Sequence, residues 1–153
     1  MILRRLKCIK SRNEWLSTIL IWLLYIEICS PKLISFLLKI IRVLMWQPVF
    51  NLQLPPVCFT LQSILSLRLP HPYMIIIHPT CRIGENCTLF HEVTLGCVES
   101  KSQKAPILSR NVYIGCKTAC LGEIIIGENC IIGACSTVLA SPPPNSKIIG
   151  LYK

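Results

Sequence analysis

Charged residues are scarce in this chain of 153 residues, and acidic residues are the scarcest of them. Only 15% of the residues are charged, with 7 acidic side chains against 16 lysines and arginines, so the net charge is +9. This balance points to an anionic ligand or an anionic membrane surface. Because no RNA- or DNA-binding signature accompanies the charge, the sequence argues against nucleic acid as a partner.

A Cys-x-x-Cys pair is also missing, although the chain has 10 cysteines. The spacing of Cys116 and Cys120 comes nearest, but neither a second pair nor a spaced histidine pair accompanies it, so no metal site is expected. Several cysteines instead fall at positions that favour a small buried side chain, namely Cys81, Cys87, Cys120 and Cys130. We therefore expect free thiols and a reducing, cytoplasmic compartment.

No apolar run reaches the ~20 residues that a transmembrane helix needs. Residues 15–29 are apolar on all sides except at three positions, and cations precede them at Arg4, Arg5, Lys7, Lys10 and Arg12. Because no small-x-small cleavage site follows, a secretory signal is not expected.

Residues 32–46 have the pattern of an amphipathic helix. Its polar face carries Ser35, Lys39, Arg42 and Trp46, and its apolar face carries Leu33, Phe36, Leu37, Ile40, Ile41 and Leu44. Two interpretations stay open for residues 1–46. The helices pack on each other and on a partner subunit, or they lie on the inner face of the membrane.

The rest of the chain is organised by a six-residue repeat. Apolar residues recur at Ile77, Ile83, Leu89 and Leu95, and the frame returns at Leu108, Ile114, Cys120, Ile126, Ile132 and Val138. Such a period predicts a β-solenoid whose inward residues fill a narrow core. Glycines that follow inward residues, such as Gly84 and Gly127, are expected at tight corners that need a permissive backbone.

Three regions follow from this pattern. Residues 1–50 form an apolar and basic helical region that caps one end of the solenoid, residues 51–70 a linker with a degenerate first coil, and residues 71–150 the solenoid. The repeat breaks at residues 97–107, which are polar and read as an excursion loop. Because loops on a rigid scaffold often carry binding residues, this loop is a candidate functional segment.

The runs 71–96 and 104–150 resemble the hexapeptide-repeat acyltransferases, and within them the serine acetyltransferase family, especially its short members from polysaccharide gene clusters. The resemblance covers residues 69–150. It implies a left-handed parallel β-helix, a homotrimer or dimer of trimers, acetyl-CoA as the cosubstrate and an active site between neighbouring subunits. It therefore implies O-acetylation of L-serine in cysteine biosynthesis or, alternatively, of a sugar hydroxyl during capsular polysaccharide or exopolysaccharide synthesis.

His71 aligns with the catalytic base of that family. An imidazole, whose pKa lies near ~6.5, suits removal of a hydroxyl proton at neutral pH. His71 also falls at an inward position of the repeat, where an unpaired imidazole would be costly. His91 contacts the acceptor or CoA, or lies on the surface, and His78 is expected at a solvent-facing corner.

Other candidates follow from the needs of a thioester substrate. Phosphates of CoA need cations, for which Lys101, Lys104, Arg110 and Lys117 are placed in or after the loop. A developing oxyanion needs a donor, for which a backbone N–H near Gly96 or Gly115 is the candidate.

Three departures from the family pattern concern the site. Pro70 replaces the aspartate before the catalytic histidine, Ala105 replaces the loop histidine, and Pro56 stands where an upstream aspartate is expected. Since carboxylates orient the imidazole and hold the ammonium of an amino acid, their loss disfavours serine as the acceptor. An inactive, membrane-associated trimeric scaffold is the alternative outside the enzymes.

Overall fold

The structure is a computed structural model, and it describes residues 15–153 except residues 42, 45–49 and 101. Two α-helices come first, α2 (Trp15–Cys29) and α3 (Lys32–Ile41). A short 3₁₀ turn, η2 (Pro56–Cys58), and helix α5 (Leu61–Ser66) follow. Thr60 caps α5, because its side chain accepts a hydrogen bond from the Ser63 backbone while the Ser63 hydroxyl accepts one from Thr60.

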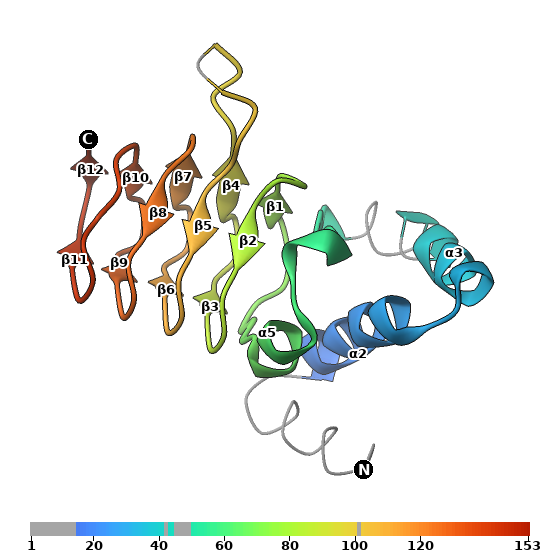
Figure 1. The fold of residues 1–153 in the computed structure, drawn as a ribbon. Helices are drawn as coiled ribbons and strands as arrows, with labels where there is room; N and C mark the ends of the chain where they lie inside the picture. Colours follow the sequence, from blue (N-terminus) through green and yellow to red (C-terminus); the bar gives the residue numbers. More distant parts are fainter. Residues whose placement is uncertain (1–14, 42, 45–49, 101) are drawn as a thin grey trace.

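Twelve short strands make up the remainder of the described chain (Figure 1). They are β1 (Ile76–Ile77), β2 (Arg82–Ile83), β3 (Thr88–Leu89), β4 (Thr94–Gly96), β5 (Ile107–Leu108), β6 (Tyr113–Ile114), β7 (Ala119–Leu121), β8 (Ile125–Ile126), β9 (Ile131–Ile132), β10 (Thr137–Val138), β11 (Lys147–Ile148) and β12 (Leu151–Tyr152).

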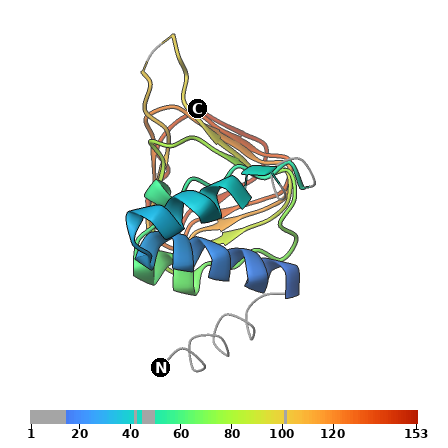
Figure 2. The same ribbon diagram turned by 90° about the vertical axis from the view of Figure 1, so that its right-hand side faces the viewer.

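Every third strand stacks on the one before it, until the last coil. The strand orders are β1-β4-β7-β10-β12 in a five-stranded sheet, β11-β9-β6-β3 in a four-stranded sheet and β2-β5-β8 in a three-stranded sheet, and all the pairs between these strands are parallel. Seen end-on, the sheets enclose a triangular core (Figure 2). This is the β-solenoid that the hexapeptide pattern predicts, in the form of the left-handed parallel β-helix that the family resemblance implies.

The six-residue frame is confirmed side chain by side chain. All the inward residues from Ile77 to Val138 are at most 3% exposed. The second set of small residues, Cys81, Cys87 and Val93, is fully buried as well. The core is thus a stack of identical positions, one from each face of each coil.

The chain turns at three corners, which we name by their residues. At the asparagine corner, between the three- and four-stranded sheets, a residue with positive φ recurs as Asn86, Asn111, Asn129 and Asn145. The amide of Asn111 donates to Asn129, and that of Asn129 donates to Asn145, each at 3.0 Å. Asparagine tolerates this left-handed backbone, so the ladder fixes the turn at little cost.

The repeat glycines serve a different purpose from the one expected. Gly84 and Gly127 do not have positive φ; instead a Cβ on Gly84 would lie 2.7 Å from the Ser109 backbone, and one on Gly127 would lie 2.5 Å from Pro144 N. Glycine is therefore required there by the close approach of the next coil, not by the conformation of the turn.

Residues 51–70 pair with the first regular coil. Gln53, Phe59 and Arg68 form isolated parallel bridges to Ile76, Ile83 and Thr88, and α5 is inserted between the last two. In this segment Leu67 and Leu69 fill the core, whereas Leu65, which the hexapeptide spacing pointed inward, is only partly buried.

Helices α2 and α3 lie at the amino-terminal end of the β-helix (Figure 1). Contrary to a simple amphipathic arrangement, α2 buries its polar side chains Ser17, Thr18 and Glu27. The Ser17 hydroxyl donates to the carbonyl of Leu69, a group at the end of the first coil. Ser17 thus satisfies a carbonyl at the open end of the solenoid, and Leu20, Ile21 and Leu24 of α2 are buried as well.

Some predictions fall on residues outside the described part of the chain. These are the five cations of residues 1–14, and Arg42 and Trp46 of the predicted amphipathic helix, of which α3 covers Lys32–Ile41. In the described residues, no helix combines the length and the hydropathy needed to cross a bilayer.

Candidate functional site

His71 lies just before β1, where the chain passes from the four-stranded to the five-stranded sheet. Its side chain is partly exposed, and the neighbouring core positions belong to Leu69 and Ile75, which are fully buried. The predicted inward position of His71 is therefore wrong, because Arg68 and Ile76 are eight residues apart, whereas their partners in the next coil, Thr88 and Thr94, are six apart. Its ring has no hydrogen-bond partner in the described part of the chain.

Aromatic rings surround His71 at this corner, which we call the histidine corner. Ring centroids lie 5.8 Å from His71 to His91, 6.2 Å to Tyr73 and 6.3 Å to Phe90. Tyr73 stacks on His91 at 5.1 Å, and Phe90 packs on Tyr113 at 5.3 Å. The structure thus brings together two histidines 20 positions apart, which one turn of the solenoid superimposes.

Glu92 and Lys117 extend the histidine corner. Glu92 Oε1 lies 4.0 Å from His91 Nε2, and Glu92 Oε2 lies 3.8 Å from Lys117 Nζ. The other ring nitrogen of His91, Nδ1, is buried without a hydrogen-bond partner in the described residues. His91 is thus a second imidazole beside His71, held by Tyr73 on one side and approached by a carboxylate on the other.

Backbone conformation at this corner matches that of the asparagine corner, but asparagine is absent. The positions with positive φ are Met74 (55°), Glu92 (58°), Lys117 (57°) and Cys135 (56°). Left-handed backbone is unfavourable for such residues, and strained residues of this kind cluster at functional sites. The histidine corner therefore has residues other than asparagine at its left-handed turn position, which indicates that side-chain chemistry matters more there than the ease of the turn.

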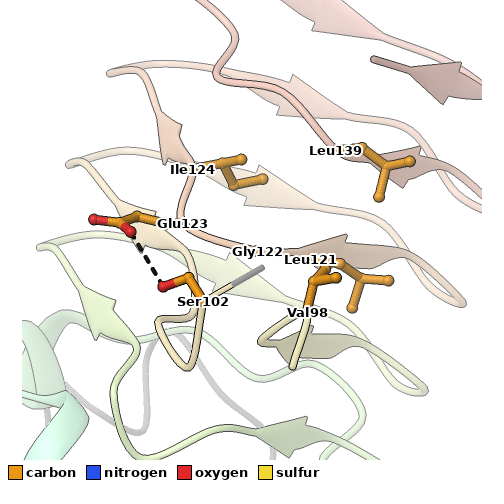
Figure 3. Close-up of a pocket in the computed structure, with 7 residues that line it drawn as sticks. All are labelled: Val98, Ser102, Leu121, Gly122, Glu123, Ile124 and Leu139. Carbon is orange, nitrogen blue, oxygen red and sulfur yellow. Dashed lines mark hydrogen bonds between the residues drawn. The ribbon is translucent and has the colours of Figure 1, made fainter. Parts of the chain in front are cut away.

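The excursion loop leaves the solenoid at the third corner, the loop corner, between the five- and three-stranded sheets (Figure 1). Below it lies a cavity of about 480 Å³ lined by Val98, Ser102, Leu121, Gly122, Glu123, Ile124 and Leu139 (Figure 3). The lining is mostly apolar, with Ser102 and Glu123 at one side. Such a hollow fits the apolar part of an extended ligand such as the pantetheine arm of CoA.

Lys104 is engaged within the loop corner. Its Nζ donates to Glu123 Oε1 at 2.6 Å, and Ser102 Oγ donates to Glu123 Oε2 at 3.2 Å (Figure 3). The hydrogen bond from Lys104 is the main cause that lowers the pKa of the Glu123 carboxyl. The lysine predicted to meet phosphate is therefore already paired, and Glu123, which the sequence did not single out, fastens the loop.

Ala105 lines a second hollow at the loop corner, of about 580 Å³, beside Lys104 and Glu123. Its side chain is buried, and its backbone N–H donates to Thr80 Oγ1 at 3.0 Å. Thr80 Oγ1 also lies 2.8 Å from His78 Nδ1 and donates to the Gln103 carbonyl. His78, expected to be a plain solvent-facing corner, thus anchors the base of the loop through Thr80.

The backbone donors predicted near the thioester are partly used by the fold. The Gly115 amide donates to the Ile132 carbonyl at 2.8 Å, and the Gly96 carbonyl accepts the Gly122 amide at 2.9 Å. The Gly115 amide is therefore not free for an oxyanion, and Gly96 contributes to the sheet. Lys101, another predicted phosphate contact, lies outside the described residues.

The predicted site residues thus fall into two groups at different corners. His71, His91, Gly115 and Lys117 belong to the histidine corner, whereas Gly96, Lys104 and Ala105 belong to the loop corner with the cavity. The whole width of the five-stranded sheet separates the two groups in one chain, so the cavity under the loop is not beside the imidazoles.

Curated relatives share the solenoid sequence. A serine acetyltransferase of Staphylococcus xylosus is 38% identical over 86 residues, which are 56% of this chain and 40% of that protein. The chain therefore spans less than half the length of this relative. No protein-family model matches the chain.

Solved structures share the fold. A serine acetyltransferase of Neisseria gonorrhoeae in complex with serine superimposes with a TM-score of 0.52 at 31% identity, covering 59% of this chain and 44% of that one. The Brucella abortus enzyme in complex with coenzyme A gives a TM-score of 0.61 at 28% identity, covering 68% and 41%.

Sequence and fold point to the same group of proteins. The chain is therefore similar in sequence and in fold to serine acetyltransferases, which are hexapeptide-repeat acyltransferases.

Proposed function

We propose that the protein transfers an acetyl group from acetyl-CoA to a hydroxyl group, with His71 as the general base and L-serine as the acceptor. The observation that carries the proposal is the cluster of His71 and His91 at the histidine corner of a β-helix similar to those of serine acetyltransferases. A serine-bound and a CoA-bound relative support the two substrates.

The chemistry needs one proton to move twice. The His71 imidazole takes the proton of the acceptor hydroxyl as its oxygen attacks the thioester carbonyl carbon. When the carbon–sulfur bond breaks, the imidazolium returns that proton to the departing thiolate of CoA. The partly exposed position of His71 suits this role, since an acceptor reaches it from solvent.

His91 is the second candidate at this site. Its ring is fixed by the stack on Tyr73 and approached by Glu92, so it holds a defined position beside His71. We propose that His91 contacts the acceptor and that Lys117, on the next coil, attracts an anionic group of a substrate.

The loop corner is proposed to hold CoA in the cavity lined by Val98, Leu121, Ile124 and Leu139. Since the two corners are separated within one chain, two copies side by side are needed to join them. This supports a homotrimer, or a dimer of trimers, in which the loop corner of one subunit meets the histidine corner of the next.

A saccharide hydroxyl is the second candidate acceptor, as in polysaccharide O-acetylation. Two observations favour it. No carboxylate contacts the His71 ring in the described residues, so the usual partner for an amino acid's ammonium group is missing there. Tyr73 and Tyr113 also present exposed rings beside Phe90, and aromatic faces suit the apolar face of a sugar.

Release of CoA from acetyl-CoA tests the proposal, with L-serine and a panel of oligosaccharides offered side by side. Because ten protein cysteines would react with a thiol reagent, CoA is separated by chromatography before it is measured. Release stimulated by serine supports the first acceptor, and release stimulated only by a saccharide supports the second. No release with any acceptor would overturn both and favour the inactive scaffold.

A further inference from the structure

The outer face of α2 is apolar, and its inner face is mixed, with Leu20, Ile21 and Leu24 buried beside three polar residues. Ser17, Thr18 and Glu27 are buried against the end of the β-helix, which turns other side chains of the helix outward. Those exposed outside are Trp15, Leu16, Ile19 and Ile26, and Trp15 is 67% exposed. Apolar side chains thus lie on both faces of α2, unlike those of a helix whose outer face meets water.

Helix α3 continues this surface, and none of its residues is buried. Its exposed apolar side chains, together with the two described residues that follow it, are Leu33, Ile34, Phe36, Leu37, Ile40, Ile41, Val43 and Leu44. With those of α2 they account for 12 of the 24 large apolar side chains that are exposed in the described residues. We call these 12 residues the apolar end. Contiguous apolar surface of this kind marks an interaction site.

The charges around the apolar end have one sign. On α3 the cations are Lys32 and Lys39, whereas the acid of α2, Glu27, is buried. In the sequence, residues 1–14, which lie outside the described residues, carry five cations and one acid, Glu14. Two copies meeting through this end would bring like charges together, whereas an anionic surface would neutralise them.

We propose that the apolar end docks on an anionic lipid surface, with α3 lying in the plane of the headgroups. The inner face of α2 packs on the β-helix, so only its outer face is open to lipid. Apolar side chains flanked by lysines are the pattern of helices that lie in a membrane interface. The β-helix would then extend away from the lipid, with the histidine corner and the loop corner open to solvent (Figure 1).

Vesicle binding by the full chain tests the inference. We expect co-sedimentation with vesicles of phosphatidylcholine and phosphatidylglycerol, at least about ten-fold weaker binding to phosphatidylcholine alone, and weakening by salt. The double variant Phe36→Ser/Leu37→Ser should lose most of this binding. Lys32→Gln and Lys39→Gln should each weaken it by about five-fold.

The matched control is Ile149→Ser/Leu151→Ser at the opposite end of the β-helix. These two side chains are 87% and 61% exposed, compared with 60% and 53% for Phe36 and Leu37. The same loss of exposed apolar surface is thus made away from the apolar end, and vesicle binding should not change.

Three results would overturn the inference. The first is equal binding to neutral and anionic vesicles, and the second is unchanged binding by the Phe36→Ser/Leu37→Ser variant. The third is that the unsubstituted chain binds no vesicles while the variant loses an oligomeric state, which would assign the surface to a second copy. Because acetyl transfer does not enter these measurements, CoA release by the same variant separates failure of this inference from failure of the proposed enzyme.

Discussion

The asparagine corner and the histidine corner have the same left-handed turn conformation but different side chains. Each turn places one residue near φ +57°, and the asparagine corner fills that position with asparagine in every coil from Asn86 to Asn145. The histidine corner fills it with Met74, Glu92, Lys117 and Cys135, beside two imidazoles and exposed aromatic rings. The difference teaches that a repeat departs from its best turn residue where the side chains have another task.

The largest expected difference between the corners concerns catalysis. Replacing His71 by alanine should lower CoA release by about 10²-fold or more, because the hydroxyl loses its proton acceptor. Acceptor-stimulated CoA release by the purified variant measures this, with circular dichroism and gel filtration as checks on the fold. The matched control, Asn129→Ala at the asparagine corner, should leave the rate per folded molecule unchanged. Full activity of His71→Ala would remove this residue from the mechanism.

The alkylation rates of the thiols at the two corners should differ by a similar factor. Burial raises the pKa of Cys87, inside the asparagine corner, from 9.0 to about 11, whereas Cys135 at the histidine corner is exposed. At pH 8 the thiolate fraction of Cys87 should therefore be about 10²-fold below that of a thiol with the ordinary pKa. A time course of alkylation by iodoacetamide, followed by peptide mass spectrometry, measures both residues. Comparable rates would contradict the buried position of Cys87.

The same shift makes stability depend on pH. The pKa of Cys87 is higher in the folded state than in the unfolded chain. The contribution of this thiol to the free energy of unfolding is therefore complete below pH 9 and is lost as pH rises towards 11. At pH 10 the free energy of unfolding should fall by about 1.4 kcal/mol for each such thiol. Urea unfolding between pH 7 and 10 measures the loss, and Cys87→Ala should show a shallower dependence than the unsubstituted chain.

The smallest effect concerns the turns themselves. Asn129→Ala should lower the free energy of unfolding by about 1–2 kcal/mol, because alanine is strained at φ 58° and loses the side-chain contacts to Asn111 and Asn145. Cys135→Asn, at φ 56°, should raise it by up to about 1 kcal/mol. Urea unfolding at pH 7 measures the free energy of unfolding of both variants. If the two substitutions changed it equally and in the same direction, the backbone strain at this turn position would not depend on the residue type.

Much of the fold could be read from the sequence because each face of each coil repeats one inward position. Ile77, Ile83 and Leu89 are six residues apart and buried for the same reason, so periodicity alone reports the core. The choice of His71 as the candidate base came from the family resemblance, and it stays a prediction. The partial exposure of His71 could not be read from the period, because the step from Arg68 to Ile76 is two residues longer than that between their partners in the next coil.

The sequence by itself determined the stack of coils, since a regular apolar period leaves a solenoid core as the way to bury every inward residue. Only the tertiary structure decided which polar residues meet. His71 and His91, Lys104 and Glu123, or Ser17 and Leu69 become neighbours because residues about one coil apart are superimposed, or because a helix folds back on the end of the stack. Local sequence carries the period, but contacts between coils depend on the exact length of each turn, which insertions such as residues 97–107 alter.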